Sequence, residues 1–283
     1  MTIYISTGGY KKKSADQTAE VFINNNIKEI ELSGGVYDSN LINNLTKYLD
    51  KGVKFQIHNY FPPPQKPFII NLASTDEDIR RLSLNHIFTA IKCCEKLNAK
   101  FYSFHAGFLC DFAISEIGKK IKKRSLFNKV QSIDLFLECL NQISKFAFDH
   151  GINIMVENNV VSKKNLLEFE KSPFLMCDPQ ETYDIMKSSP ENVKLLVDVA
   201  HLKVSSKSLN FQPKDFFLKC NDYISGYHLS DNNGFEDTNE KIDEKSWFWE
   251  YLKNNLDYYS LEIYGETIES LKKIKTICQN KLK

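Results

Sequence analysis

VKLLVDVAH (residues 193–201) is an apolar run that ends on an aspartate, with a histidine three positions further on. Nearly continuous apolar runs are typical of strands in parallel sheets, which are buried on both faces. The stretch predicts a strand over Val193–Asp198 that carries Asp198 to one end of a sheet, with His201 close by.

Similar runs recur along the chain and alternate with stretches whose apolar residues have helical spacing. We predict eight strands: Ile3–Thr7, Ile27–Ser33, Val53–Asn59, Ala99–His105, Ile152–Glu157, Val193–Asp198, Ile224–Leu229 and Tyr258–Ile263. The clearest helical patterns cover Asp76–Leu97, Asp134–His150, Asp178–Met186 and Thr267–Leu282.

Eight strands alternating with helices indicate an α/β protein with a parallel sheet, and the number eight favours a closed (β/α)8 TIM barrel. A doubly wound sheet would need a GxGxxG turn after an early strand. Neither Gly8-Gly9 nor Gly34-Gly35 fits that motif. We expect one barrel domain over residues 1–283.

The composition excludes several classes of protein. Lys plus Arg is 37 and Asp plus Glu is 36, so the net charge of +1 provides no general attraction to nucleic acid or to an anionic membrane. We expect no signal peptide, and no apolar run approaches the ~20 residues of a membrane span. The seven cysteines form no CxxC pair, which favours buried, reduced thiols in a cytoplasmic protein.

Ionisable residues stand at the ends of most predicted strands. The C-terminal ends of the strands of a parallel barrel converge on one mouth, so side chains distant in sequence can meet there. Carboxylates and imidazoles brought together in this way need a shared cation. We predict one divalent metal ion, with Mn, Mg, Co and Zn all open, held by Glu157, Asp198, His228 and Glu262. His58 and His105 end two further strands.

Other polar features have less specific interpretations. Glu31 is expected to have a structural role, paired with a lysine in the barrel mouth. The run Lys119–Arg124 is either a solvated helix face or a contact for a phosphate group. It lies in one of two long loops, Asn59–Thr75 and Gly107–Gln131, and long loops in compact domains are often functional.

Several short motifs carry a family resemblance: FHAG around His105, VEN at Glu157, DVAH with Asp198 and His201, and HLSDNNG with His228 and Asp231. In order and spacing, the chain resembles the xylose isomerase-like TIM barrel superfamily. That superfamily includes sugar phosphate isomerases, ketose 3-epimerases and endonuclease IV.

The resemblance implies the same four metal ligands, with Glu157 and Glu262 also acting as catalytic acid and base. It implies that His201 contacts a substrate oxygen. His58 and His105 would bind the substrate or, as in the endonuclease-like members, hold a second metal. Those members have an Asp-x-His motif after the seventh strand. Here Asp237 fits, but Asn239 replaces the histidine, which argues against a third metal.

We therefore expect an isomerase or epimerase that acts on a sugar or sugar phosphate through an enediolate. The alternatives are a phosphodiesterase of the endonuclease IV type and a non-catalytic carbohydrate-binding barrel. A small-molecule partner is expected, with no membrane; a nucleic-acid partner is disfavoured, and a homo-oligomer stays open.

Overall fold

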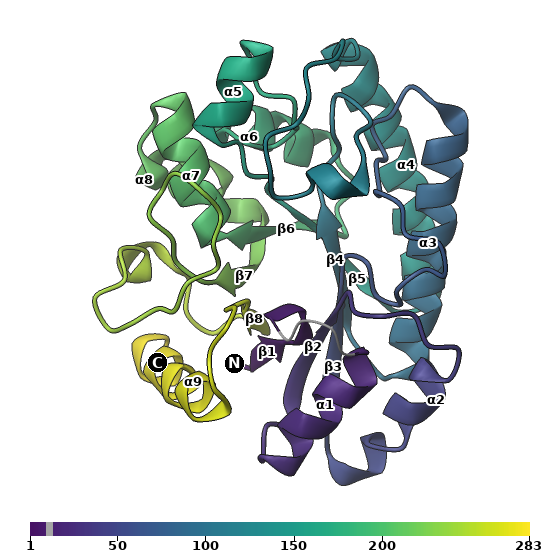
Figure 1. The fold of residues 1–283 in the computed structure, drawn as a ribbon, viewed down its shortest axis with the longest axis vertical. Helices are drawn as coiled ribbons and strands as arrows, with labels where there is room; N and C mark the ends of the chain where they lie inside the picture. Colours follow the sequence, from purple (N-terminus) through teal and green to yellow (C-terminus); the bar gives the residue numbers. More distant parts are fainter. Residues whose placement is uncertain (10–13) are drawn as a thin grey trace.

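The computed structural model describes residues 1–9 and 14–283, and its strands form one closed parallel barrel in chain order (Figure 1). Each strand pairs in parallel with its two neighbours, and the first strand closes the barrel against the last. The predicted (β/α)8 TIM barrel is confirmed. The strands are β1 (Ile3–Ser6), β2 (Glu29–Ser33), β3 (Lys54–His58), β4 (Phe101–His105), β5 (Asn153–Glu157), β6 (Val193–Asp198), β7 (Ile224–Leu229) and β8 (Tyr258–Leu261).

Helices surround the barrel in Figure 1, with α3 and α4 on one flank and α7 and α8 on the other. Their buried faces pack on the strands, which encloses the barrel in a second layer. The helices are α1 (Ala15–Asn24), α2 (Leu41–Thr46), α3 (Glu77–Lys96), α4 (Lys129–Asp149), α5 (Lys163–Phe169), α6 (Pro179–Ser188), α7 (Val199–Leu209), α8 (Pro213–Cys220) and α9 (Ile268–Lys281).

The four predicted helical patterns correspond to α3, α4, α6 and α9, and their capping residues explain where two of them begin. Asn128 caps α4 by accepting a hydrogen bond from the backbone of Gln131, so this helix starts five residues before the predicted Asp134. Asp178 caps α6 in the same way, and Pro179 occupies the first helical position, where its missing N–H costs no hydrogen bond.

Strand ends place the ionisable residues at the C-terminal mouth. Asp198 is both the last residue of β6 and the N-cap of α7, where its Oδ1 accepts the backbone N–H of His201 at 2.8 Å. The strand therefore passes directly into a helix, which fixes one oxygen of this carboxylate. Glu262 lies one residue beyond the end of β8.

The two predicted long loops connect β3 to α3 and β4 to α4. The basic run Lys119–Arg124 lies in the second loop and outside any helix, so its interpretation as a helix face is wrong. Carboxylates in and near this loop pair with the run: Lys120 with Glu168 at 2.5 Å, and Arg124 with Glu116 at 2.7 Å. Part of the basic charge is thus offset within the protein.

All seven cysteines are buried and free, as the sequence predicted. Burial raises the pKa of these thiols, for example to about 11 at Cys139, which keeps them protonated and unreactive. Among the helices of residues 1–9 and 14–283, none is both long enough and apolar enough to span a bilayer.

Candidate metal centre

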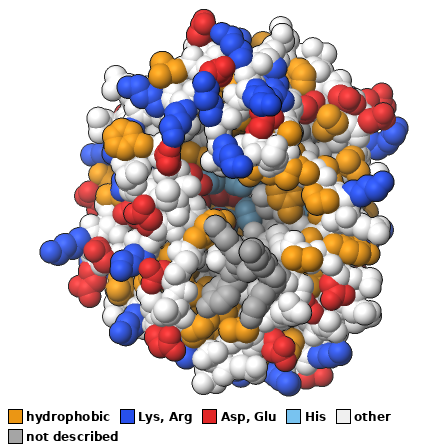
Figure 2. Space-filling model, in the orientation of Figure 1, with side chains coloured by type: hydrophobic (Ala, Val, Ile, Leu, Met, Phe, Trp, Pro, Cys, Tyr) orange, Lys and Arg blue, Asp and Glu red, His pale blue; other side chains and the backbone are white. Residues whose placement is uncertain are grey.

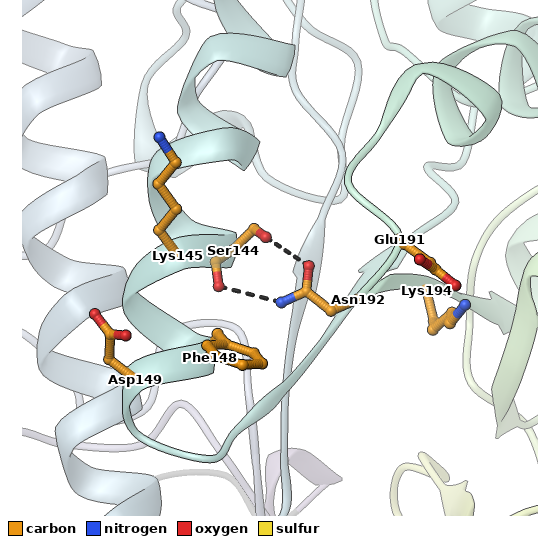
Figure 3. Close-up of a pocket in the computed structure, with 7 residues that line it drawn as sticks. All are labelled: Ser144, Lys145, Phe148, Asp149, Glu191, Asn192 and Lys194. Atoms are coloured by element: carbon orange, nitrogen blue, oxygen red, sulfur yellow. Dashed lines mark hydrogen bonds between the residues drawn. The ribbon is translucent and has the colours of Figure 1, made fainter.

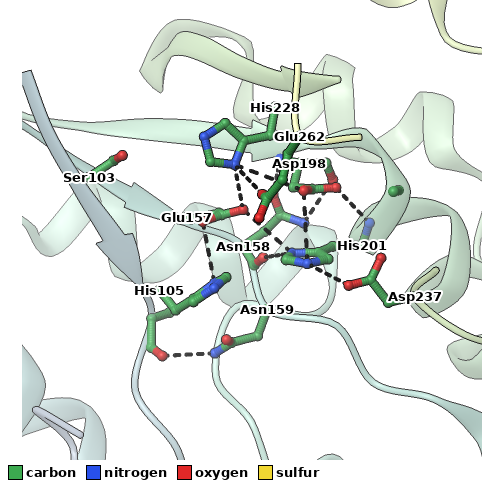
Figure 4. Close-up of polar contacts among 12 residues, drawn as sticks. Ser103, His105, Glu157, Asn158, Asn159, Asp198, His201, His228, Asp237 and Glu262 are labelled. Atoms are coloured by element: carbon green, nitrogen blue, oxygen red, sulfur yellow. Dashed lines mark hydrogen bonds and ion pairs between the residues drawn. The ribbon is translucent and has the colours of Figure 1, made fainter. Parts of the chain in front are cut away.

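The hollow at the centre of the barrel mouth has histidine and carboxylate side chains on its floor (Figure 2). Its central group is the imidazole of His228, which is fully buried at the end of β7. The Nδ1 atom lies 3.1 Å from Oε1 of Glu157 and 3.2 Å from Oε2 of Glu262 (Figure 4). Asp198 Oδ2 lies 4.0 Å from the same nitrogen. Three carboxylates thus converge on one ring nitrogen.

The second oxygen of Glu157 faces a different pair of histidines. Oε2 lies 3.4 Å from His58 Nε2 and 3.4 Å from His105 Nδ1. The other ring nitrogen of His58 is within 3.0 Å of Ser103 Oγ, which orients the ring. Glu157 therefore stands between two groups of nitrogen and oxygen atoms and presents one oxygen to each.

His201 lies beside this arrangement in the first turn of α7. Its Nδ1 is 2.9 Å from the backbone oxygen of Asn158, an acceptor only, so Nδ1 carries the proton and donates. Its Nε2 then faces Asp237 Oδ2 at 3.2 Å (Figure 4). The side chain of Asn158 also exchanges two hydrogen bonds with the backbone of Asp198. Asn158 therefore holds both Asp198 and His201 in place.

The pKa values of the carboxylates diverge. Burial by itself raises the pKa of Glu157, but the surrounding His105, His228 and His58 lower it well below its usual value. Burial raises the pKa of Asp198 to about 7, and the negative charge of Glu157 acts in the same direction. Of two carboxylates beside the same histidine, Glu157 thus binds a proton more weakly than usual and Asp198 more strongly.

The histidines diverge as well. Burial lowers the pKa of His105 to about 4, although 27% of its side chain stays exposed. Burial also acts to lower the pKa values of His201 and His228, but neighbouring carboxylates raise both well above the usual value: chiefly Asp198 for His201, and Glu31 for His228. His105 is therefore neutral at pH 7, whereas the other two attract a proton or another cation.

The residues of this centre fit a divalent cation. Within the described part of the chain, Glu157 Oε2, Asp198 Oδ2 and His105 Nδ1 are buried without a hydrogen-bond partner. Buried polar atoms are costly unless something pairs with them, and carboxylate oxygen with imidazole nitrogen is a ligand set that divalent metals accept. Two sets have ligand atoms within 4.8 Å of one another: His58, Glu157, His228 and Glu262; and His105, Glu157 and His201.

The structure brings together the seven residues that the sequence assigned to the metal or the substrate, and their roles stay predictions. They are His58, His105, Glu157, Asp198, His201, His228 and Glu262. Asp198 belongs to neither of the two sets, whereas His58, expected as a substrate contact, belongs to the first. Glu31 was predicted to pair with a lysine. Among the described residues its partners are instead His228 and Tyr258, because β2 directs it across the barrel interior.

Sequence reasoning missed three residues that touch this centre: Asn158, Tyr258 and Tyr264. Tyr264 donates a hydrogen bond to Glu262 Oε1 at 3.1 Å, which leaves Oε2 directed towards His228. Asn158 immediately follows Glu157, so adjacency was a usable signal for it. No local pattern marks the two tyrosines, because a strand sequence does not tell which side chains meet across the barrel.

A second hollow lies far from this mouth, between α4 and the start of β6 (Figure 3). Ser144 and Asn192 exchange two hydrogen bonds at its floor, and the exposed ring of Phe148 lines its side. Its charged groups, Lys145, Asp149, Glu191 and Lys194, have mixed sign and do not converge on one point (Figure 3). We assign it no chemistry.

Comparison with known proteins gives a family and several relatives. The model of a family described as "Xylose isomerase-like TIM barrel" matches residues 19–276. An uncharacterised protein of Methanocaldococcus jannaschii is 24% identical over 165 residues, 58% of this chain and 53% of that protein. A probable endonuclease 4 of Campylobacter fetus is 25% identical over 225 residues, 73% of this chain and 70% of that protein.

This chain thus spans about half the length of the Methanocaldococcus relative. Among solved structures, a D-tagatose 3-epimerase-like protein superposes with a TM-score of 0.74 over 100% of this chain and 97% of that one, at 21% identity. At that identity the likeness supports the fold and leaves the reaction open.

Proposed function

The chain belongs to the xylose isomerase-like TIM barrel family, and on that premise we propose that it is a divalent-metal-dependent isomerase or epimerase of a sugar or sugar phosphate. One observation carries the proposal. Glu157 and Glu262, from β5 and β8, both lie within 3.2 Å of the same nitrogen of His228. Two carboxylates beside one cation position are what proton removal and return next to a carbonyl require.

The cation would be held by Glu157, Asp198, His228 and Glu262, and when bound it would polarise a substrate carbonyl. Glu157 is the better candidate for the base, because the surrounding histidines keep it ionised. Glu262 then returns the proton. Its side chain is 11% exposed, whereas that of Glu157 is fully buried, so Glu262 is the carboxylate closer to solvent.

The three remaining histidines would bind the substrate. His201 Nε2 points towards Asp237 and is oriented by the backbone of Asn158, so it is a rigid contact for a substrate hydroxyl or carbonyl. His105 is the most exposed of the three and neutral, which suits a hydrogen bond to an uncharged sugar oxygen. His58 is buried beneath them and contacts Glu157.

A second candidate, phosphodiester hydrolysis of the endonuclease IV type, is favoured by a separate observation. Glu157 Oε2 lies 3.4 Å from His58 and from His105, so these residues would hold a second cation, and two-metal hydrolases use such a pair to stabilise the attacking and leaving oxygens. The similarity to a probable endonuclease 4 points the same way. Asn239 in place of a histidine, and a net charge of +1, count against it.

The deciding experiment combines metal analysis with two substrate assays. Elemental mass spectrometry of the purified protein and of Asp198→Ala gives the metals per chain. Proton NMR in D₂O reports exchange at the carbon next to the carbonyl for a panel of ketoses and ketose phosphates. A duplex oligonucleotide with one abasic site, tested across a salt series, reports strand cleavage.

About one metal per chain, lost in Asp198→Ala, together with deuterium incorporation into one of the sugars, is the expected result. Two or three zinc ions per chain with cleavage at the abasic site would replace the proposal with the second candidate. A protein that takes up no divalent cation would overturn both.

A further inference from the structure

Glu31 on β2 makes a contact that crosses the barrel. Its side chain is fully buried, and its Oε2 lies 2.8 Å from Nε2 of His228 on β7. In the closed barrel, β1 and β8 stand between these two strands. The phenol of Tyr258 donates a hydrogen bond to the same oxygen of Glu31. The far side of His228, away from the three carboxylates at Nδ1, is therefore occupied by a fourth carboxylate.

A glycine in the barrel interior makes room for this contact. Gly226 lies opposite Tyr258 in the register of β7 and β8, one layer below His228. A Cβ at Gly226 would come within 3.1 Å of the Tyr258 ring, 3.1 Å of Leu196 and 3.2 Å of Met155 Sδ. The missing side chain gives the tyrosine ring its place, and from there its hydroxyl reaches Glu31.

A neutral imidazole has one N–H and one lone pair, and only the nitrogen with the lone pair can bind a cation. A carboxylate can only accept, so Glu31 favours the tautomer with its proton at Nε2, and a cation shared with Glu157, Glu262 and Asp198 would then take the Nδ1 lone pair. Ring rotation would lose the 2.8 Å hydrogen bond. Contact with the ring of His58, whose centroid is 4.6 Å away, further restricts the orientation.

We propose that Glu31, held by Tyr258, is a positioning residue that fixes the tautomer and the ring orientation of His228 so that Nδ1 serves as the cation ligand. This rests on the cation site of the proposed function. Glu31 itself contacts neither the cation nor the substrate. Second carboxylates of this kind typically contribute 10- to 100-fold to metal affinity.

The test is a titration of the metal-free protein with Co²⁺, followed by its visible absorption, which reports the ligands directly and needs no substrate. Glu31→Gln keeps the shape and an acceptor but removes the charge, and Glu31→Ala removes the whole carboxylate. Tyr258→Phe keeps Glu31 and removes the hydroxyl that donates to it. We expect the Kd for Co²⁺ to rise about 10-fold or more in Glu31→Gln, further in Glu31→Ala, and by less in Tyr258→Phe, with a changed absorption envelope.

Glu116→Gln is the matched control, because Glu116 is also a buried carboxylate but pairs with Arg124 in the β4–α4 loop. Its Kd for Co²⁺ should equal that of the unmodified protein, although its melting temperature falls. If Glu31 were only structural, its variants would likewise melt earlier with unchanged Kd and spectrum, and the inference would be overturned. Should both Glu31 variants fail to fold, Tyr258→Phe decides on the same readout.

Failure of the inference and failure of the proposed function are distinguishable. If the unmodified protein binds Co²⁺, loses it in His228→Ala, and keeps its affinity in the Glu31 and Tyr258 variants, only the role of Glu31 is refuted. If the unmodified protein binds no Co²⁺, the cation site is refuted and the role of Glu31 with it.

Discussion

The Nε2 atom of His201 lies 3.2 Å from Oδ2 of Asp237, a residue of the loop that follows β7. This pair joins the first turn of α7 to the loop between β7 and β8, and the two side chains face each other (Figure 4). Two residues further on, Asn239 is buried, and its backbone oxygen accepts a hydrogen bond from the backbone of Tyr264 at 2.9 Å. The loop is thereby tied to the segment that carries Glu262.

Asp237→Asn should lower kcat/KM by about 10-fold or more, because a hydrogen bond to a charged group contributes about 1.5–3 kcal/mol. In this variant His201 loses the carboxylate that orients its Nε2. Steady-state kinetics on the sugar identified in the exchange assay measure it. Glu236→Gln is the matched control: Glu236 precedes Asp237 in the loop but pairs with the exposed Lys164. Equal kinetics in both variants would remove Asp237 from the site.

Glu157→Gln and Glu262→Gln should each lower kcat by about 100- to 10,000-fold, the usual contribution of a general acid or base. The amide keeps the shape of the side chain but cannot accept the proton. Rates of solvent exchange at the substrate carbon measure the effect, and far-UV circular dichroism verifies the fold. Retention of full activity by either variant would refute the proposed acid–base pair.

His86 should make stability depend on pH between about 4 and 6.5. This histidine of α3 packs near Phe68, and burial lowers its pKa to about 4 from the usual 6.5. As the pH falls through 6.5, His86 binds a proton in the unfolded chain but stays neutral in the folded protein. The free energy of unfolding therefore falls, by up to about 3 kcal/mol at pH 4. This contribution of His86 is fully present above pH 6.5.

Urea unfolding at pH 7.5, 6.0 and 5.0 measures this slope, in the unmodified protein and in His86→Leu. The variant cannot take up a proton at this position, so its stability should fall less over the same range. Parallel pH profiles for the two proteins would show that His86 titrates alike in the folded and unfolded states.

Gly226→Ala should lower the free energy of unfolding by about 1–3 kcal/mol, the usual effect of overpacking a core. The added methyl group would be 3.1 Å from Tyr258 and from Leu196, both fully buried, so one of them must move. Chemical denaturation measures the loss, and Co²⁺ titration shows whether the displacement reaches His228.

The strands and four of the helices could be predicted because their signals are local. An apolar run such as that before Asp198 specifies a buried strand, and the 3.6-residue period over 76–97 specifies the amphipathic α3. The parallel arrangement follows from the alternation of the two, and it places every strand end at the same mouth. Because Glu157, Asp198, His228 and Glu262 stand at such strand ends, the sequence already predicts that they lie together.

The sequence by itself therefore determined the barrel and the set of ionisable residues at its mouth. Only the tertiary structure decided that Glu31 pairs with His228 rather than with a lysine, and that carboxylates pair with Lys120 and Arg124 of the basic run. The physical reason is the range of the interactions. Strand and helix formation depend on neighbours within a few residues, whereas partners 197 positions apart meet only after the barrel has closed.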